Sequence, residues 1–112
     1  MKLRTIKRIY CELNRENFGG RLAEPTILIS RSAGIHGKVS DGRNRGPIMS
    51  FNPVDEKTLR AMRGTVYHEM IHQYLDYHLN VEDNAHHGEK YWLAYFTFAN
   101  QTFDWEKPED YA

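Results

Sequence analysis

Two histidines separated by three residues lie within a long stretch that favours helix. Residues 55–79 contain no proline, and Gly64 is the weakest helix former among them. Residues four apart in a helix project from the same face, so His68 and His72 can reach one metal ion. Zinc accepts imidazole nitrogen readily. The segment His68-Glu69-Met70-Ile71-His72 therefore predicts a zinc site on a helix.

Glu69 follows the first histidine directly, so on a helix it lies beside the ion rather than on it. From there its carboxylate can take a proton from zinc-bound water and later deliver it to a leaving amine. A purely structural zinc site has no use for such a base. We therefore predict a zinc metalloendopeptidase with Glu69 as the catalytic residue. The alternative is a non-catalytic, zinc-stabilised module that binds DNA or another protein.

Two protein ligands are too few for a catalytic zinc, which usually has three. His78 has the spacing of a known extended motif, but Leu75 stands where that motif needs a glycine to turn the chain back. If the helix continues, His78 points about 240° away from His72. Glu89 is a second candidate on the next predicted helix, although its surroundings lack the aspartate that usually accompanies such a ligand.

The pair His86-His87 is the third candidate and the one we favour. A connection of about seven residues after the long helix allows the next helix to fold back antiparallel. The first turn of that helix then faces the metal. Gly88 relieves crowding at this close approach, so we prefer His87 over His86.

The remaining sequence predicts an α+β domain that covers residues 1–112. Apolar residues recur at steps of three and four over residues 2–17, which is typical of an amphipathic helix. Three short runs, 26–30, 35–40 and 47–51, are bounded by turn residues and favour a small three-stranded antiparallel sheet. We expect the long helix next, with Asp55 as its N-cap. An aromatic-rich helix at about 87–101 and an acidic tail from about 102 complete the expected order.

The composition is that of a soluble domain, with 40% hydrophobic and 27% charged residues. No apolar run approaches the roughly 18 residues of a membrane span, and the basic N-terminus lacks the apolar segment of a signal peptide. We therefore expect a cytoplasmic (intracellular) protein without a membrane partner. The single cysteine, Cys11, cannot form an internal disulfide or a Cys-rich zinc ribbon, and we expect it to be a small buried residue.

Four stretches follow one another in the chain: Tyr10-Cys11-Glu12-Leu13-Asn14 with Phe18-Gly19-Gly20-Arg21-Leu22, Ile29-Ser30-Arg31 with Ala33-Gly34, the His68–His72 motif, and His87-Gly88-Glu89-Lys90-Tyr91. Together they resemble the SprT-like (Spartan) family of metalloproteases, with Tyr91 in the family's Phe place. The resemblance implies one zinc per chain, held by His68, His72 and His87, with Glu69 as the base. It also implies protein or peptide substrates, which in the best-known members are bound or crosslinked to DNA, and hence a role in DNA–protein crosslink repair.

We expect any contact with DNA to come from the domain itself, because the given sequence does not include the zinc ribbon that many family members append. Residues 1–63 hold 13 Lys and Arg against 6 Asp and Glu, whereas residues 64–112 hold 2 against 9. The charges are thus +7 and −7, and the basic half could bind phosphates or simply be solvated. The candidate DNA contacts lie in the strand-and-turn region beside the expected cleft: Arg31, Lys38, Arg43 and Arg45.

Two further parts of a peptidase site remain open in the sequence. Extended peptide would bind along an edge strand of the 26–51 sheet. A donor is needed for the oxyanion that forms during hydrolysis. Tyr91 and Tyr95 are candidates by their position, but the sequence does not assign this role.

Overall fold

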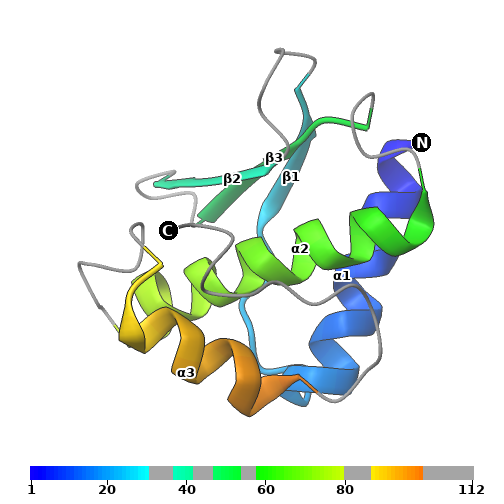
Figure 1. Ribbon diagram of the computed structural model, residues 1–112. Coiled ribbons are helices and arrows are strands. Elements are labelled where there is room, and N and C mark those ends of the chain that lie inside the picture. Colours follow the sequence, from blue (N-terminus) through cyan, green and yellow to red (C-terminus); the bar gives the residue numbers. More distant parts are fainter. Residues whose placement is uncertain (31–36, 42–46, 54–57, 80–86, 100–112) are drawn as a thin grey trace.

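The computed structural model describes residues 1–30, 37–41 (backbone only), 47–53, 58–79 and 87–99. It is an α+β structure in which two helices cross beside a small sheet and a third helix packs next to the second (Figure 1). The elements in chain order are α1 (Leu3–Phe18), β1 (Thr26–Ile29), β2 (Gly37–Asp41), β3 (Pro47–Phe51), α2 (Leu59–Gln73), the π-helical turn η2 (Tyr74–His78) and α3 (Glu89–Phe98).

Helix α1 matches its predicted range closely. The apolar residues that recur at steps of three and four form its buried face. Gly19 and Gly20 end it with φ values of 64° and 74°, a left-handed conformation that glycine adopts without strain. The side chain of Asn14 then holds the returning chain through two 3.2 Å hydrogen bonds with the backbone of Leu22. The buried residues of α1 are Ile6, Ile9, Tyr10, Leu13, Asn17 and Phe18.

Cys11 is exposed, so the prediction of a buried cysteine is wrong. The physical reason is its place on the helix. Cys11 is four residues after Lys7 and four before Arg15, both exposed, and so lies on the solvent face rather than beneath Ile6 and Leu13.

The sheet has three strands in the order β1-β3-β2, and the prediction of a wholly antiparallel sheet is wrong. Strand β2 pairs antiparallel with β3, but β1 pairs parallel with β3, for example Ile27 with Met49. Strand β3 therefore inserts between β1 and β2 instead of extending a simple meander. Its alternating burial, with Met49 and Phe51 inside, gives the sheet one face toward the helices.

Helix α2 begins at Leu59, where the side chain of Thr58 accepts a hydrogen bond from the Ala61 amide at 3.0 Å. Thr58 is thus the N-cap in place of the expected Asp55, which lies outside the described residues. The helical path continues through η2 to His78, close to the predicted end near Leu79.

Helix α3 runs back along α2 in the opposite direction, as predicted (Figure 1). The pairs in contact show this order: as the residue number rises along α2, that of its partner on α3 falls. These pairs are Tyr67 with Tyr95, His68 with Tyr91, and His72 with His87 just before α3 begins.

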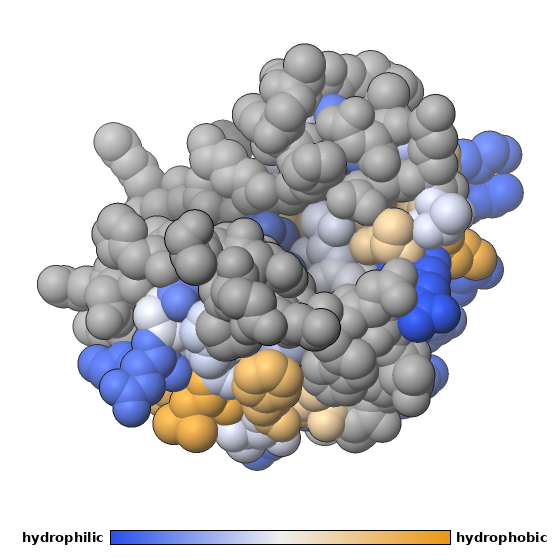
Figure 2. Space-filling model, in the orientation of Figure 1, coloured by the Kyte–Doolittle hydropathy of each residue, from blue (hydrophilic) through white to orange (hydrophobic). Residues whose placement is uncertain are grey.

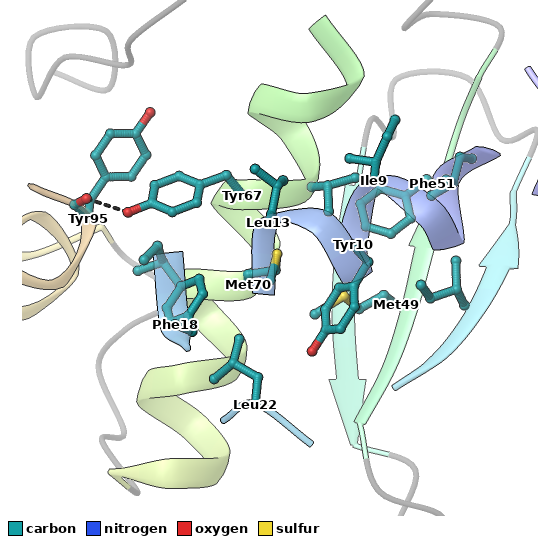
Figure 3. Close-up of a cluster of buried hydrophobic side chains, with 14 of the residues drawn as sticks. Ile9, Tyr10, Leu13, Phe18, Leu22, Met49, Phe51, Tyr67, Met70 and Tyr95 are labelled. Atoms are coloured by element: carbon teal, nitrogen blue, oxygen red, sulfur yellow. Dashed lines mark hydrogen bonds between the residues drawn. The ribbon is translucent and has the colours of Figure 1, made fainter. Parts of the chain in front are cut away.

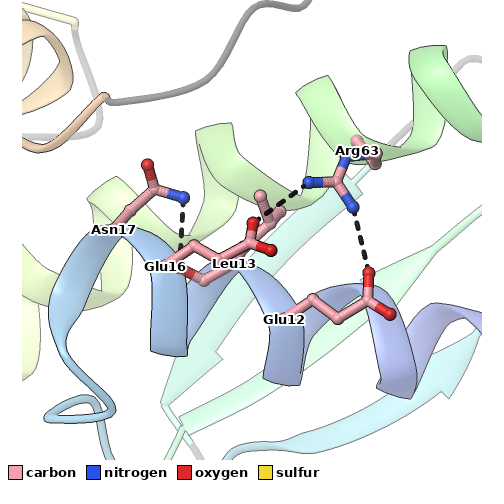
Figure 4. A network of polar contacts seen from close by, with 5 residues as sticks. All are labelled: Glu12, Leu13, Glu16, Asn17 and Arg63. Carbon is pink, nitrogen blue, oxygen red and sulfur yellow. Dashed lines mark hydrogen bonds and ion pairs between the residues drawn. The ribbon is translucent and has the colours of Figure 1, made fainter.

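The core joins all of these elements (Figure 3). Aliphatic, methionine and aromatic side chains, Phe51 of β3 among them, fill the space between α1, α2 and the sheet. Aromatic rings also pack between α2 and α3, as those of Tyr67 and Tyr95 do. The buried hydroxyl of Tyr67 donates a hydrogen bond to the carbonyl of Tyr95 and so ties α2 to α3. On the solvent side, Arg63 of α2 forms ion pairs with Glu12 and Glu16 of α1 at 3.2 and 3.5 Å (Figure 4).

The outer face of α3 is less buried than its aromatic composition predicts. Tyr91 and Tyr95 are fully buried, but Phe96 and Leu93 are 52% and 69% exposed. Hydrophobic side chains gather accordingly at the lower edge of Figure 2, where α3 lies. Every helix among the described residues is too short or too polar to span a membrane.

Candidate metal centre

Three histidines converge at one point beside the C-terminal half of α2. The Nε2 atom of His72 lies 3.1 Å from that of His68 and 3.1 Å from that of His87, and the remaining pair is 3.0 Å apart. Two of the side chains come from adjacent turns of α2, and the third comes from the residue before the N-cap of α3. The antiparallel packing of the two helices therefore brings together residues fifteen and nineteen positions apart.

These three contacts cannot all be hydrogen bonds. An imidazole nitrogen that carries a proton has no lone pair left to accept one. In a triangle of three nitrogens, at least one contact must therefore join two donors or two acceptors, which repel. A cation shared by three lone pairs removes this conflict. Tetrahedral zinc with bonds of about 2.0–2.1 Å separates its ligand atoms by about 3.3 Å, so the observed triangle fits that ion closely.

A buried polar network fixes the end of α2 that carries His68 and His72. Gln73, directly after His72, is fully buried and donates to the carbonyl of Ala23 at 2.6 Å. The hydroxyl of Tyr10 donates to the side-chain oxygen of Gln73 at 2.7 Å. Burial raises the pKa of Tyr10 well above its usual range, so the hydroxyl keeps its proton and remains a donor. The network joins α1, the segment before β1 and α2, and so sets the rotation of the motif helix.

His87 reaches the site in a strained backbone conformation. Its φ of 52° makes it the one non-glycine residue with a positive φ among the described residues. A residue with a Cβ avoids this region, although histidine enters it more often than most. Gly88 follows in an extended conformation and caps α3. The left-handed turn at His87 is what directs its ring back toward α2.

Glu69 lies beside the three histidines rather than among them. Its carboxylate oxygen is 3.7 Å from the Nε2 atom of His68, and the residue is 6% exposed. The group of side chains that could hold one ion consists of His68, His72 and His87 among the described residues. If the three histidines held an ion, this carboxylate would lie close enough to accept a proton from a water between it and that ion.

The sequence suggested Tyr91 as a candidate oxyanion donor and did not indicate its contact with a histidine. Its hydroxyl lies 2.8 Å from Nδ1 of His68, and the residue is fully buried. Tyr95 is also fully buried. Neither tyrosine is therefore exposed to a substrate, which argues against the oxyanion role considered for them. The sequence feature that could have predicted a contact of Tyr91 with the histidines is its position four residues after His87, which favours the same side of the helix.

The other candidates from the sequence lie elsewhere or outside the described residues. His78 is exposed and stacks on Tyr74 with ring centroids 6.2 Å apart, and Glu89 is exposed in the first turn of α3. His86 lies outside the described residues. So do three of the candidate DNA contacts, Arg31, Arg43 and Arg45, together with the side chain of the fourth, Lys38.

Comparison with known proteins agrees with the arrangement of the site. Searches of curated proteins and of solved structures gave no match. A model of the SprT-like family matches residues 6–109, which include α1, the sheet, the motif helix and α3. The match covers nearly the whole chain and all three histidines. The chain therefore belongs to the SprT-like family.

Proposed function

We propose that this protein is a zinc-dependent endopeptidase whose metal is held by His68, His72 and His87. The observation that carries the proposal is the convergence of three Nε2 atoms within 3.0–3.1 Å, with the Glu69 carboxylate 3.7 Å from one of them. A structural zinc site has four protein ligands, whereas a catalytic one has three and keeps a position for water. Among the residues that the structure describes, three histidines and an adjacent base match the catalytic type.

These positions assign different roles to the ion and to Glu69. Zinc bound by three imidazoles would lower the pKa of a coordinated water toward about 7 and polarise the scissile carbonyl. Glu69 would accept the proton of the attacking water at its carboxylate and pass that proton to the leaving amine. The low exposure of Glu69 keeps bulk water from competing for that proton.

Strand β2 is the better candidate for binding an extended substrate. In the described sheet, β1 and β2 are the two outer strands, and β3 is paired on both sides. Strand β2 contacts α2, the helix that carries the motif, whereas β1 contacts α1. A peptide added to the side of β2 that does not pair with β3 would form backbone hydrogen bonds with this strand and lie on the side of the sheet nearest the motif helix.

The substitution Glu69→Gln tests the proposal. It keeps the size of the side chain and leaves the three histidines intact, so the protein should still bind one zinc. Cleavage of an unfolded protein substrate should fall by about 10²–10⁴-fold, the usual contribution of a general base. The control is Glu24→Gln, which makes the same change at an exposed position and should leave kcat unchanged. Full activity of Glu69→Gln would refute the general-base role.

We also propose that the preferred substrates are proteins associated with DNA, and α1 supports this. Its solvent face carries four exposed cations, Arg4, Lys7, Arg8 and Arg15, opposite the buried stripe. These lie on one side of a rigid helix, so they can meet a row of phosphates together without reading sequence.

Salt dependence of DNA binding tests this second proposal. Four phosphate contacts would make the logarithm of the duplex binding constant fall with that of salt concentration with a slope of about −3 to −4. The double substitution Lys7→Glu and Arg8→Glu should reduce both affinity and slope. Lys90→Glu, an exposed lysine on α3, is the control. Unchanged DNA binding in the α1 variant would exclude this face as the DNA contact. That result would not bear on the proposal of zinc-dependent cleavage, which rests on other residues.

A further inference from the structure

We propose that Tyr91 is the positioning residue of the metal centre: its hydroxyl holds the His68 ring with Nε2 toward the ion, and its ring supports all three imidazoles. The inference rests on the three-histidine centre proposed above and assigns a role to a residue that is not itself a ligand. Its evidence is the hydrogen bond at Nδ1 of His68 and the ring contacts with all three histidines.

Which atom donates in this hydrogen bond follows from which imidazole nitrogens face the ion. The Nε2 atoms converge, so His68 must offer its Nε2 lone pair to the ion and carry its proton on Nδ1. The Nδ1 atom lies 2.8 Å from the hydroxyl oxygen of Tyr91, which then accepts a hydrogen bond from Nδ1–H. A hydroxyl can pair with Nδ1 in either tautomer, so what the bond fixes is the rotation of the His68 ring, with Nε2 turned toward the other two Nε2 atoms.

The ring of Tyr91 contacts the whole cluster. Its centroid lies 5.3 Å from that of His68, 4.9 Å from His72 and 4.7 Å from His87. The contact with His87 is edge-to-face at 83° and that with His72 is tilted by 33°. Because these planes differ, one rigid, fully buried ring limits the rotation of three imidazoles in different directions.

The position of Tyr91 also connects the two helices that supply the ligands. It lies in the first turn of α3, four residues after His87, while its hydroxyl reaches His68 on α2. Correct docking of α3 therefore places one ligand and orients another at the same time. Loss of the hydroxyl should weaken metal binding without loosening the core, because the aromatic ring stays in place.

The substitution Tyr91→Phe separates the hydroxyl from the ring. We expect zinc affinity, measured by competition with a chromogenic chelator, to fall by about 10–100-fold, the usual effect of removing a hydrogen-bond partner of a metal ligand. The control is Tyr67→Phe, which removes another buried tyrosine hydroxyl between α2 and α3, bonded to a carbonyl instead of a histidine. That variant should keep its zinc affinity to within about threefold. The unfolding midpoints of both metal-free variants show whether either has lost stability.

Nuclear magnetic resonance of the zinc-loaded protein gives a signature that a merely structural role would not produce. In the native protein the Nδ1 proton of His68 should be protected from exchange and shifted downfield. In Tyr91→Phe that resonance alone among the three ligand histidines should move upfield or exchange away. Equal zinc affinity in Tyr91→Phe and the native chain, or an equal loss in Tyr67→Phe, would overturn the proposal. Failure of the native chain itself to bind zinc would instead refute the metal centre.

Discussion

The backbone of His87 offers a test of how the third histidine reaches the site. A φ of 52° is unfavourable for any residue with a Cβ, so the folded protein must hold His87 against its own preference. The substitutions His87→Ala and His87→Gly both remove the imidazole. They differ in that only glycine adopts this conformation freely. Comparing the two in metal-free protein therefore isolates the backbone strain from the loss of the ligand.

The expected magnitude combines two opposing effects. The left-handed conformation costs a residue with a Cβ roughly 1–2 kcal/mol. Glycine has greater freedom in the unfolded chain, which offsets about 0.4–1 kcal/mol of this. We therefore expect His87→Gly to be more stable than His87→Ala by about 1 kcal/mol, or about 4 °C in the unfolding midpoint of a domain of this size. Urea or thermal unfolding in the presence of a chelator measures the difference.

Leu93 provides the matched control because it is 69% exposed in the middle of α3 and has ordinary helical geometry. There the order should reverse, with Leu93→Gly less stable than Leu93→Ala by about 0.5–1 kcal/mol. If His87→Ala proves as stable as His87→Gly, or more so, the strain at His87 does not exist and the account of the third ligand is wrong.

Three further predictions concern the metal and the helix that carries it. His87→Ala should abolish tight zinc binding, whereas His78→Ala should leave it unchanged in a chelator competition, because His78 is exposed and stacks on Tyr74. Removing zinc should lower the unfolding midpoint; at 1,000 times the Kd a ligand of the folded state contributes about 4 kcal/mol, so a midpoint independent of zinc would argue against a native site. Gln73→Leu should cost about 1–3 kcal/mol in urea unfolding, and its combination with Tyr10→Phe should cost less than the sum because the two side chains form one network.

The helices and the shared helix face of the two motif histidines were predictable because their signals are local. The three-and-four pattern of α1, the glycines after Phe18 and the four-residue spacing of the motif histidines each depend on a few neighbouring residues. The preference for His87 required one more step, the return of α3 along α2. That step could be inferred from the short connection, and the structure brings His87 to the other two histidines.

The sheet order was not predictable from the same kind of signal. A strand in a parallel pair and one in an antiparallel pair share a period of two, so the pattern of Thr26–Ile29 does not reveal its partner's direction. The link between β1 and β2 is long enough to carry the chain past the position that β3 later fills. The insertion of β3 beside β1 is a property of the whole fold, which local residues do not encode.

Two other differences have different causes. The exposure of Cys11 could have been predicted from the sequence, because Cys11 lies between cations on the helix face opposite Ile6. The prediction of burial rested on the usual preference of cysteine for the core and not on this position. The contact between Tyr91 and His68 was not available, because it depends on how closely α3 approaches α2. A distance of 2.8 Å between side chains of two helices follows from the packed core rather than from spacing along the chain.

Zinc content together with the coordination sphere tests the central claim most directly. X-ray absorption or a crystal structure of the zinc-loaded chain should show one zinc per chain, three imidazole nitrogens from His68, His72 and His87, and a fourth light ligand supplied by water. A fourth ligand from the protein would indicate a structural site. A sphere that lacks any of the three histidines, or purified protein that binds no zinc, would contradict the account.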